Sequence, residues 1–192
     1  MSNVYLIVND GFKYKEFTLR ITDVMEIAPS EINQREVMKF NYFNISMKNW
    51  WHGLTASFNN IVGDPPADIP DISEWHGGSL VFSRKAYDCL YALLEPHGEF
   101  LPVDCDGEIF FVFNCFTLAL VDERNSEQNI MDGTFMGIKK IVFNPLDLPG
   151  KTIFKTKYDR CFSLYCGDEL VQKVNDSGLT GIQFRTHLED TL

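Results

Sequence analysis

The clearest pattern in the chain is a short apolar run followed by apolar residues at helical spacing. Residues 80–82 predict a strand, and Ser83 is suited to cap the helix that follows it. Pro96 and Gly98 then end that helix. The residues expected on its apolar face recur every three or four positions: Ala86, Tyr87, Leu90, Leu93 and Leu94.

The same plan occurs again near the C-terminal end. Residues 161–166 form an apolar run, and a helix is expected to begin at Gly167 or Asp168 and to end at Gly178. Another apolar run, residues 181–184, follows. Both helices are too short to be stable alone in water, so each is expected to pack on a sheet.

The first third of the chain alternates between apolar and polar residues, which is typical of strands. A change of phase at Tyr42–Phe43 indicates a bulge or bend. The elements expected here are a hairpin of residues 4–8 and 12–21 around the turn 9–11, a long bent strand within 35–51, and a short helix within 52–62.

A proline-rich segment, residues 63–71, divides the chain into an N-terminal β-rich region, 1–64, and a second region, 65–192. The second region is expected to contain two strands around an Asp106–Gly107 turn, a long polar surface loop at 122–137, and strands at 138–145 and 152–155. The fold class predicted is α+β, with an antiparallel N-terminal sheet and a mixed sheet that carries two short packing helices.

The net charge is −10, and nine of the ten excess negative charges fall in residues 65–192. Such a charge repels nucleic acid and anionic membranes and favours a basic partner. No apolar run approaches the ~20 residues needed to span a bilayer, and the first residues lack the basic start of a signal peptide. We therefore expect a cytoplasmic protein that binds neither nucleic acid nor membrane.

Few residues suggest enzyme chemistry. Cys166 at a helix start would be a nucleophile if it were exposed and paired with a base, but the neighbouring acids oppose a thiolate, so a structural cysteine is expected. The DCDGE segment, 104–108, resembles the start of a calcium loop, yet a hairpin turn fits it better because the later ligands of such a loop are missing. The sequence predicts no catalytic residue, no metal site and no cofactor.

Three tryptophans are the best candidates for binding a partner, because Trp anchors many protein interfaces. Trp50 and Trp51 are adjacent, so on a strand they would point to opposite faces, and Trp75 lies across the proline-rich segment. The alternative is that they are half-buried core residues.

Five segments of the second region, in this order, resemble a family of bacterial polymorphic-toxin immunity proteins of the Myxococcus type. They are PDIS..W.GGSLVFSRKAYDCL, EFLPVDCDGEIFFVFN, LVDERNSE, IKKIVFNPLDLPGKTIFK and GDELVQKVNDSGLTGIQF, and together they cover about residues 66–186. The first 65 residues match no such pattern. The resemblance implies a non-enzymatic, cytosolic protein that binds and blocks a cognate toxin, of the kind delivered by type VI secretion. It implies no catalytic residue.

Combined with the acidic charge, the resemblance leads us to expect a basic, nuclease-type toxin as the partner. We predict that its binding surface lies near the proline-rich segment and consists of Trp50, Trp51 and Trp75 with an acidic rim of Asp64, Asp68, Asp71 and Glu74. Two alternatives stay open. One is a hydrolase-like enzyme that uses Cys166 or the 104–108 carboxylates, and the other is an adaptor of a secretion system.

Overall fold

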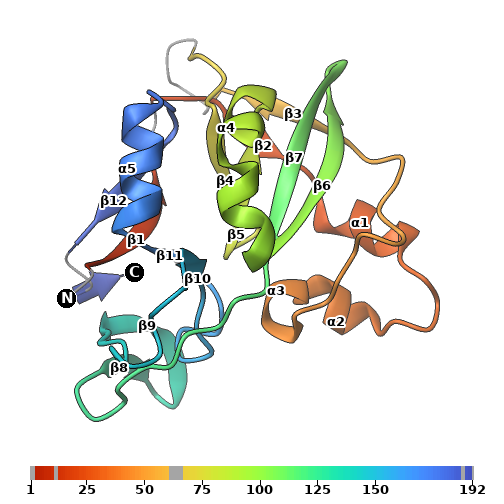
Figure 1. Cartoon of the computed structure of the whole chain (residues 1–192). Coiled ribbons are helices and arrows are strands. Elements are labelled where there is room, and N and C mark those ends of the chain that lie inside the picture. Colours follow the sequence, from red (N-terminus) through yellow and green to blue (C-terminus); the bar gives the residue numbers. More distant parts are fainter. Residues whose placement is uncertain (1–2, 11–12, 61–66, 187–188, 192) are drawn as a thin grey trace.

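The computed structural model describes residues 3–10, 13–60, 67–186 and 189–191 (Figure 1). Its largest sheet is mixed, because strands β3 and β6 pair in parallel while the other neighbours are antiparallel. In spatial order this sheet contains β2 (Glu16–Thr18), β3 (Thr55–Asn59), β6 (Gly98–Cys105), β7 (Glu108–Cys115), β5 (Ser79–Phe82) and β4 (Ile72–Trp75).

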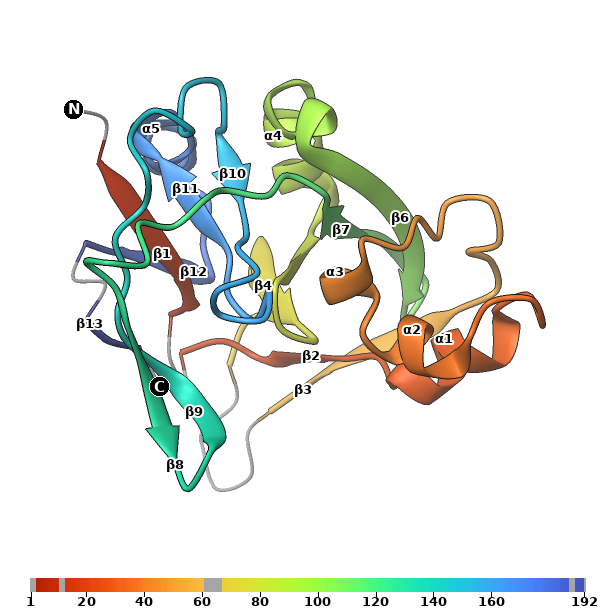
Figure 2. The same cartoon turned by 90° about the horizontal axis from the view of Figure 1, so that it is seen from below.

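A second sheet is antiparallel and combines the two ends of the chain. Its order is β10 (Ile153–Phe154), β11 (Tyr165–Gly167), β1 (Val4–Asn9) and β12 (Ile182–Arg185). A third, small sheet has the order β13 (Glu189–Thr191), β9 (Thr134–Lys140) and β8 (Glu127–Met131), and its β8–β9 hairpin extends away from the other sheets (Figure 2). The predicted α+β fold with an antiparallel and a mixed sheet is confirmed.

Both predicted packing helices are present and lie next to each other (Figure 1). Helix α4 (Arg84–Leu94) is capped by Ser83, whose Oγ accepts a hydrogen bond from the backbone N–H of Ala86. A short 3₁₀ turn, η1 (Glu95–His97), continues from it. Helix α5 (Asp168–Asp176) begins after Gly167, as predicted. The apolar faces of both helices share one core with residues of both larger sheets, so the two helices and the two sheets stabilise one another.

The opposite face of the six-stranded sheet is covered by three short helices: α1 (Ile21–Ile27), α2 (Gln34–Met38) and α3 (Phe40–Phe43). Strand β7 shows how both faces of this sheet are buried. Phe110 and Val112 pack toward these helices, whereas Phe111 and Phe113 pack toward α4. The sheet is therefore apolar on both sides.

The predicted N-terminal hairpin is wrong. Strand β1 pairs with β11 and β12, whereas β2 pairs with β3 in a different sheet. The predicted long strand within 35–51 is also wrong, because this segment contains α2 and α3. Asn33 caps α2, and the buried residues Val37, Phe40 and Asn41 follow helical spacing, which the period-two alternation of their neighbours concealed.

Two further predictions fail. The described part of residues 52–62, which ends at 60, contains strand β3 rather than a helix, since Ala56 and Phe58 are buried alternately with more exposed neighbours. Residues 122–137 contain β8 and the start of β9 rather than a loop, with Asp132 and Gly133 at the left-handed turn between them. More than half of the residues in these two strands are exposed, and they lack a regular alternation of apolar and polar positions, so the sequence pattern did not reveal the hairpin.

The proposed boundary within 63–71 falls partly outside the described residues, which exclude 61–66. Residues on both sides of it share one sheet and one core. Phe17 and Phe58 from the first region pack together with Trp75 and Val81 from the second. Across the described ranges, no helix is both long and apolar enough to cross a membrane.

Candidate functional site

The predicted tryptophan anchors lie mostly inside the molecule. The indole N–H of Trp51 donates to the carbonyl of Pro102 at 2.7 Å, and that of Trp75 donates to the carbonyl of Leu19 at 2.8 Å. Both side chains are buried, whereas Trp50 is half-buried against the same core. These hydrogen bonds join Trp75 of β4 to the residues before α1 and Trp51 to β6, and both side chains offer little surface to a partner.

The predicted acidic rim is not one surface. Asp64 lies outside the described residues, and the Asp68 carbonyl accepts a hydrogen bond from the backbone N–H of Lys15. Glu74 is half-buried and accepts from the backbone N–H of Asn9 at 3.3 Å, and this burial raises the pKa of Glu74. A role for these residues in binding stays a prediction, but the structure does not bring them together.

The carboxylate of Asp71 connects two parts of the fold through hydrogen bonds. Its carboxylate accepts from Lys85 Nζ at 2.9 Å, from the backbone N–H of Thr180 at 3.1 Å and from Ser83 Oγ at 3.2 Å. Burial alone would raise the pKa of Asp71, but the hydrogen bonds from Lys85 and Thr180 outweigh it, so the pKa is lowered. Asp71 thus joins the start of α4 to the chain that enters β12.

Two residues considered for catalysis, Cys166 and Asp104, have structural roles in the fold. Cys166 is fully buried in β11, and burial raises the pKa of its thiol, which is the reverse of an activated nucleophile. Asp104 accepts from the backbone N–H of Gly107 at 2.8 Å and so stabilises the β6–β7 turn, where Asp106 and Gly107 are left-handed. The predicted hairpin is confirmed. Among the described residues, no three His, Cys, Asp or Glu side chains are grouped to hold a metal ion.

We expect only one thiol to react rapidly in the native protein. All five cysteines are free, and burial raises the pKa of Cys105 and Cys115 to about 12 and of Cys161 to about 11. Only Cys89 is partly exposed. A chromogenic disulfide reagent should therefore give one fast phase, absent in Cys89→Ser, with the other four thiols reacting only as the protein unfolds. Two or more fast thiols would contradict this arrangement.

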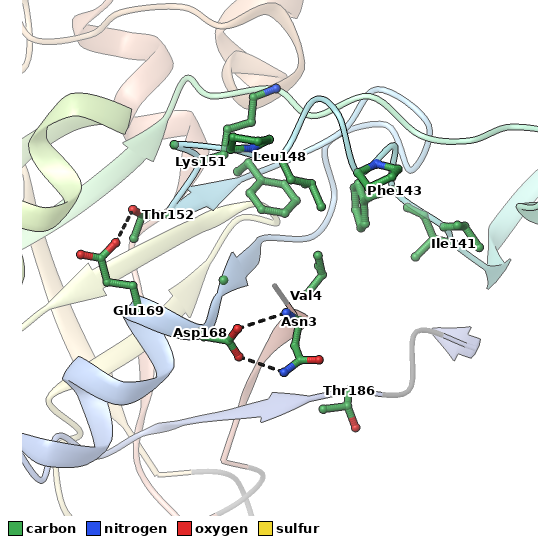
Figure 3. Close-up of a pocket in the computed structure, with 16 residues that line it drawn as sticks. Asn3, Val4, Ile141, Phe143, Leu148, Lys151, Thr152, Asp168, Glu169 and Thr186 are labelled. Atoms are coloured by element: carbon green, nitrogen blue, oxygen red, sulfur yellow. Dashed lines mark hydrogen bonds between the residues drawn. The ribbon is translucent and has the colours of Figure 1, made fainter. Parts of the chain in front are cut away.

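A large cleft lies where the antiparallel sheet meets the loop 144–152 (Figure 3). Its volume is about 950 Å³. The cleft is lined by the first residues of β1, by β10 and by the start of α5. Five of its apolar residues belong to an apolar cluster that packs on the antiparallel sheet and is separate from the two cores beside the six-stranded sheet: Val4, Ile141, Phe143, Leu148 and Phe154. The cleft thus offers apolar surface on a rigid support.

Two carboxylates stand at one edge of this cleft, at the start of α5 (Figure 3). Asp168 accepts from the backbone N–H and from the side-chain amide of Asn3, each at 3.1 Å, and from the hydroxyl of Tyr5 at 2.9 Å. The Asn3 and Tyr5 hydrogen bonds lower the pKa of Asp168, so it stays ionised. Glu169 accepts from Thr152 Oγ1 at 3.3 Å and is otherwise exposed.

Lys151, a cation that lines the cleft, already has hydrogen-bond partners. Lys151 Nζ donates to the carbonyl of Leu118 at 2.7 Å and to Asp147 at 2.5 Å, and it points away from the carboxylates (Figure 3). The cleft therefore has an apolar floor and a negative edge. This combination suits a Lys or Arg side chain, whose apolar stem can lie on the floor while its charge meets the carboxylates.

Sequence reasoning missed this cleft because its residues come from four separate segments of the chain: 3–4, 141–154, 167–169 and 186. The only available signal was the pair of acids at the start of α5, which we interpreted as a helix start. No protein-family model matches the chain, and a search of curated protein sequences finds no match either.

Proposed function

We propose that this protein is an immunity protein that binds a basic toxin in the cytoplasm and neutralises it by stoichiometric inhibition. The cleft of Figure 3 carries the proposal, because it is an open apolar surface with a negative edge on a chain of net charge −10. Long-range attraction would speed the encounter with a basic partner, and the apolar floor would slow its release. The resemblance of residues 66–186 to toxin immunity proteins supports the same function.

The enzyme alternative gains no support from two of the residues named for it. Cys166 is buried, and the carboxylate of Asp104 stabilises a turn. A secretion-system adaptor would also bind a protein partner, so it must be distinguished by experiment. The direct test is co-expression with the protein encoded immediately upstream. An immunity protein should rescue growth and form a complex of fixed stoichiometry with it, whereas an adaptor should bind without rescue.

Reversing the charge of Glu169 should slow capture of the toxin. We expect Glu169→Lys to reduce the association rate several-fold at low salt, and the difference should shrink as salt rises because screening shortens the field to ~10 Å at 0.1 M. Stopped-flow kinetics would measure both rates. Asp176→Lys is the matched control, since it makes the same charge change at the other end of the same helix.

A similar slowing by Glu169→Lys and Asp176→Lys would mean that only net charge matters and that the cleft is not the binding site. An association rate that does not depend on salt would contradict electrostatic capture altogether. Circular dichroism of both variants should show an unchanged fold, because Lys at the start of a helix costs only about 0.3–1 kcal/mol and Lys at its end is favourable.

A further inference from the structure

A second hollow, with the opposite charge, lies on the side of the three short helices. It has a volume of about 460 Å³ and is formed by α2 and α3, the turn between β4 and β5, and the segment 160–162. We call it the aromatic–basic hollow. The residues that line it are Arg35, Met38, Lys39, Asn41, Tyr42, Phe43, His76, Arg160 and Phe162. None of them lines the cleft of Figure 3.

The backbone around this hollow is held in place by a buried amide. The side-chain N–H₂ of Asn41 donates to the carbonyl of Gly77 at 2.7 Å and to that of Cys161 at 2.9 Å, so it ties together all three segments. The chain also adopts left-handed backbone at three non-glycine residues here, His76, Arg160 and Cys161. Such conformations are unfavourable and occur often at binding sites, where they fix the direction of side chains.

The edge of the hollow is unusually apolar for an exposed surface. Phe162 is 68% exposed, Phe43 is 43% exposed and Met38 is 41% exposed. Exposed apolar patches mark interaction sites in many proteins, and Phe, Met, Tyr and Arg are the residues enriched at protein interfaces. The side chains of the hollow therefore have the composition of a protein-binding surface.

The cations of the hollow are not engaged in the ion pairs that the described part of the chain forms. No ion pair of the described residues includes Arg35, Lys39 or Arg160. Nearby, Lys157 Nζ lies 3.7 Å from the ring centre of Tyr42 and is likewise outside every such pair. The adjacent Asp159 is buried, accepts from the hydroxyl of Tyr165 and belongs to none of these ion pairs. On a chain of net charge −10, this is a local positive surface.

We propose that the aromatic–basic hollow is a docking site for a protein segment that presents carboxylates next to an aromatic or aliphatic side chain. The carboxylates pair with Arg35, Lys39 and Arg160, and the apolar side chain packs between Phe43 and Phe162. The charge complementarity selects an acidic segment, whereas the cleft of Figure 3 selects a basic one. The proposal therefore does not depend on the proposed toxin binding.

The test is a selection of random peptides displayed on phage against the whole immobilised protein. We expect the selected peptides to combine Asp or Glu with a neighbouring Phe, Trp or Leu. The best peptide, made with a fluorescent label, should bind more weakly as salt rises. Peptides without this combination would overturn the proposal. So would stronger binding of ATP or of a single-stranded oligonucleotide that displaces the peptide.

Two pairs of variants locate the binding. Phe162→Ala should weaken the peptide about 30-fold or more, as for a hot-spot residue, whereas Leu146→Ala, which removes an 89% exposed side chain elsewhere, should have no effect. Lys39→Glu should also weaken binding, and Lys173→Glu on α5 should not. Equal effects within either pair would overturn the proposed location. Glu169→Lys should leave the peptide affinity unchanged, which separates this site from the cleft.

Discussion

Replacing Gly181 with alanine is expected to destabilise the protein by about 3–5 kcal/mol, enough to remove much of the stability of a typical domain. A Cβ atom at this position would lie 2.0 Å from the carbonyl oxygen of Ile72 and 2.4 Å from Cβ of Pro70. The backbone φ of +105° adds strain for any side chain. Urea unfolding monitored by the fluorescence of the buried tryptophans would measure the loss.

The matched control is Gly178→Ala, three residues earlier. Gly178 also has positive φ, +57°, but a Cβ there would meet nothing within 4 Å, so the loss should be only about 1–2 kcal/mol. The difference between the two losses of stability measures the cost of the steric contact that a Cβ at position 181 would make with Pro70 and Ile72. Equal losses would show that backbone strain alone decides both.

Gly181 is sensitive because the two larger sheets meet there. Its carbonyl accepts from the backbone N–H of Asp10 at the end of β1, and the neighbouring carbonyl of Thr180 accepts from Ile72 in β4, at 2.9 and 3.0 Å. A side chain at position 181 would therefore separate the sheets along this line. We expect the damage to be global rather than local.

Asp159→Asn should stabilise the protein above pH 6 by up to about 3 kcal/mol. Burial raises the pKa of Asp159 from 3.8 to about 6, although hydrogen bonds from Tyr165 and Ser163 oppose the rise. The folded state therefore holds this proton more tightly than the unfolded state. The contribution of Asp159 to stability is present in full below pH 3.8 and is lost as the pH rises to about 6, where the buried carboxylate must ionise.

Asparagine keeps an acceptor for the hydroxyl of Tyr165 and for the backbone N–H of Ser163 but cannot ionise. The gain in unfolding free energy of Asp159→Asn over the parent should therefore grow from pH 4 to pH 6 and then stay constant. Denaturation series across pH 4–8 would measure it. Asp122→Asn is the control of opposite sign, since hydrogen bonds, chiefly from Asn125, lower the pKa of Asp122. A gain for Asp159→Asn that does not change with pH would contradict the assignment.

Local signals in the sequence are sufficient for the elements that depend on local chemistry. Ser83 caps α4 through an N–H three residues away, and Asp106–Gly107 turns β6 directly into β7, so a short window contains the cause of each. The hairpin predicted from 4–8 and 12–21 fails for the opposite reason. Its first strand takes partners near the far end of the chain, and nothing in the turn at 9–11 reveals them.

The two proposed binding surfaces could not be predicted from the sequence for the same reason. The sequence drew attention to Trp51 and Trp75 because of their type, but their indole N–H groups satisfy carbonyls inside the core. Phe162 attracted no notice because one Phe in an apolar run looks like core, yet its neighbours Arg160 and Cys161 are left-handed, and Phe162 itself is largely exposed. Exposure of this kind depends on three segments that only the fold brings together.

The position of β1 has a consequence for synthesis on the ribosome. Leu6 pairs with Tyr165 on one side and with Arg185 on the other, so this early strand must wait for residues that emerge much later. Until then its apolar run VYLIV has two open edges, a form of chain that associates readily with other strands. The six-stranded sheet, whose last strand ends at Cys115, can assemble before the antiparallel sheet does. A nascent chain of this protein is therefore expected to need protection by a chaperone at its first strand.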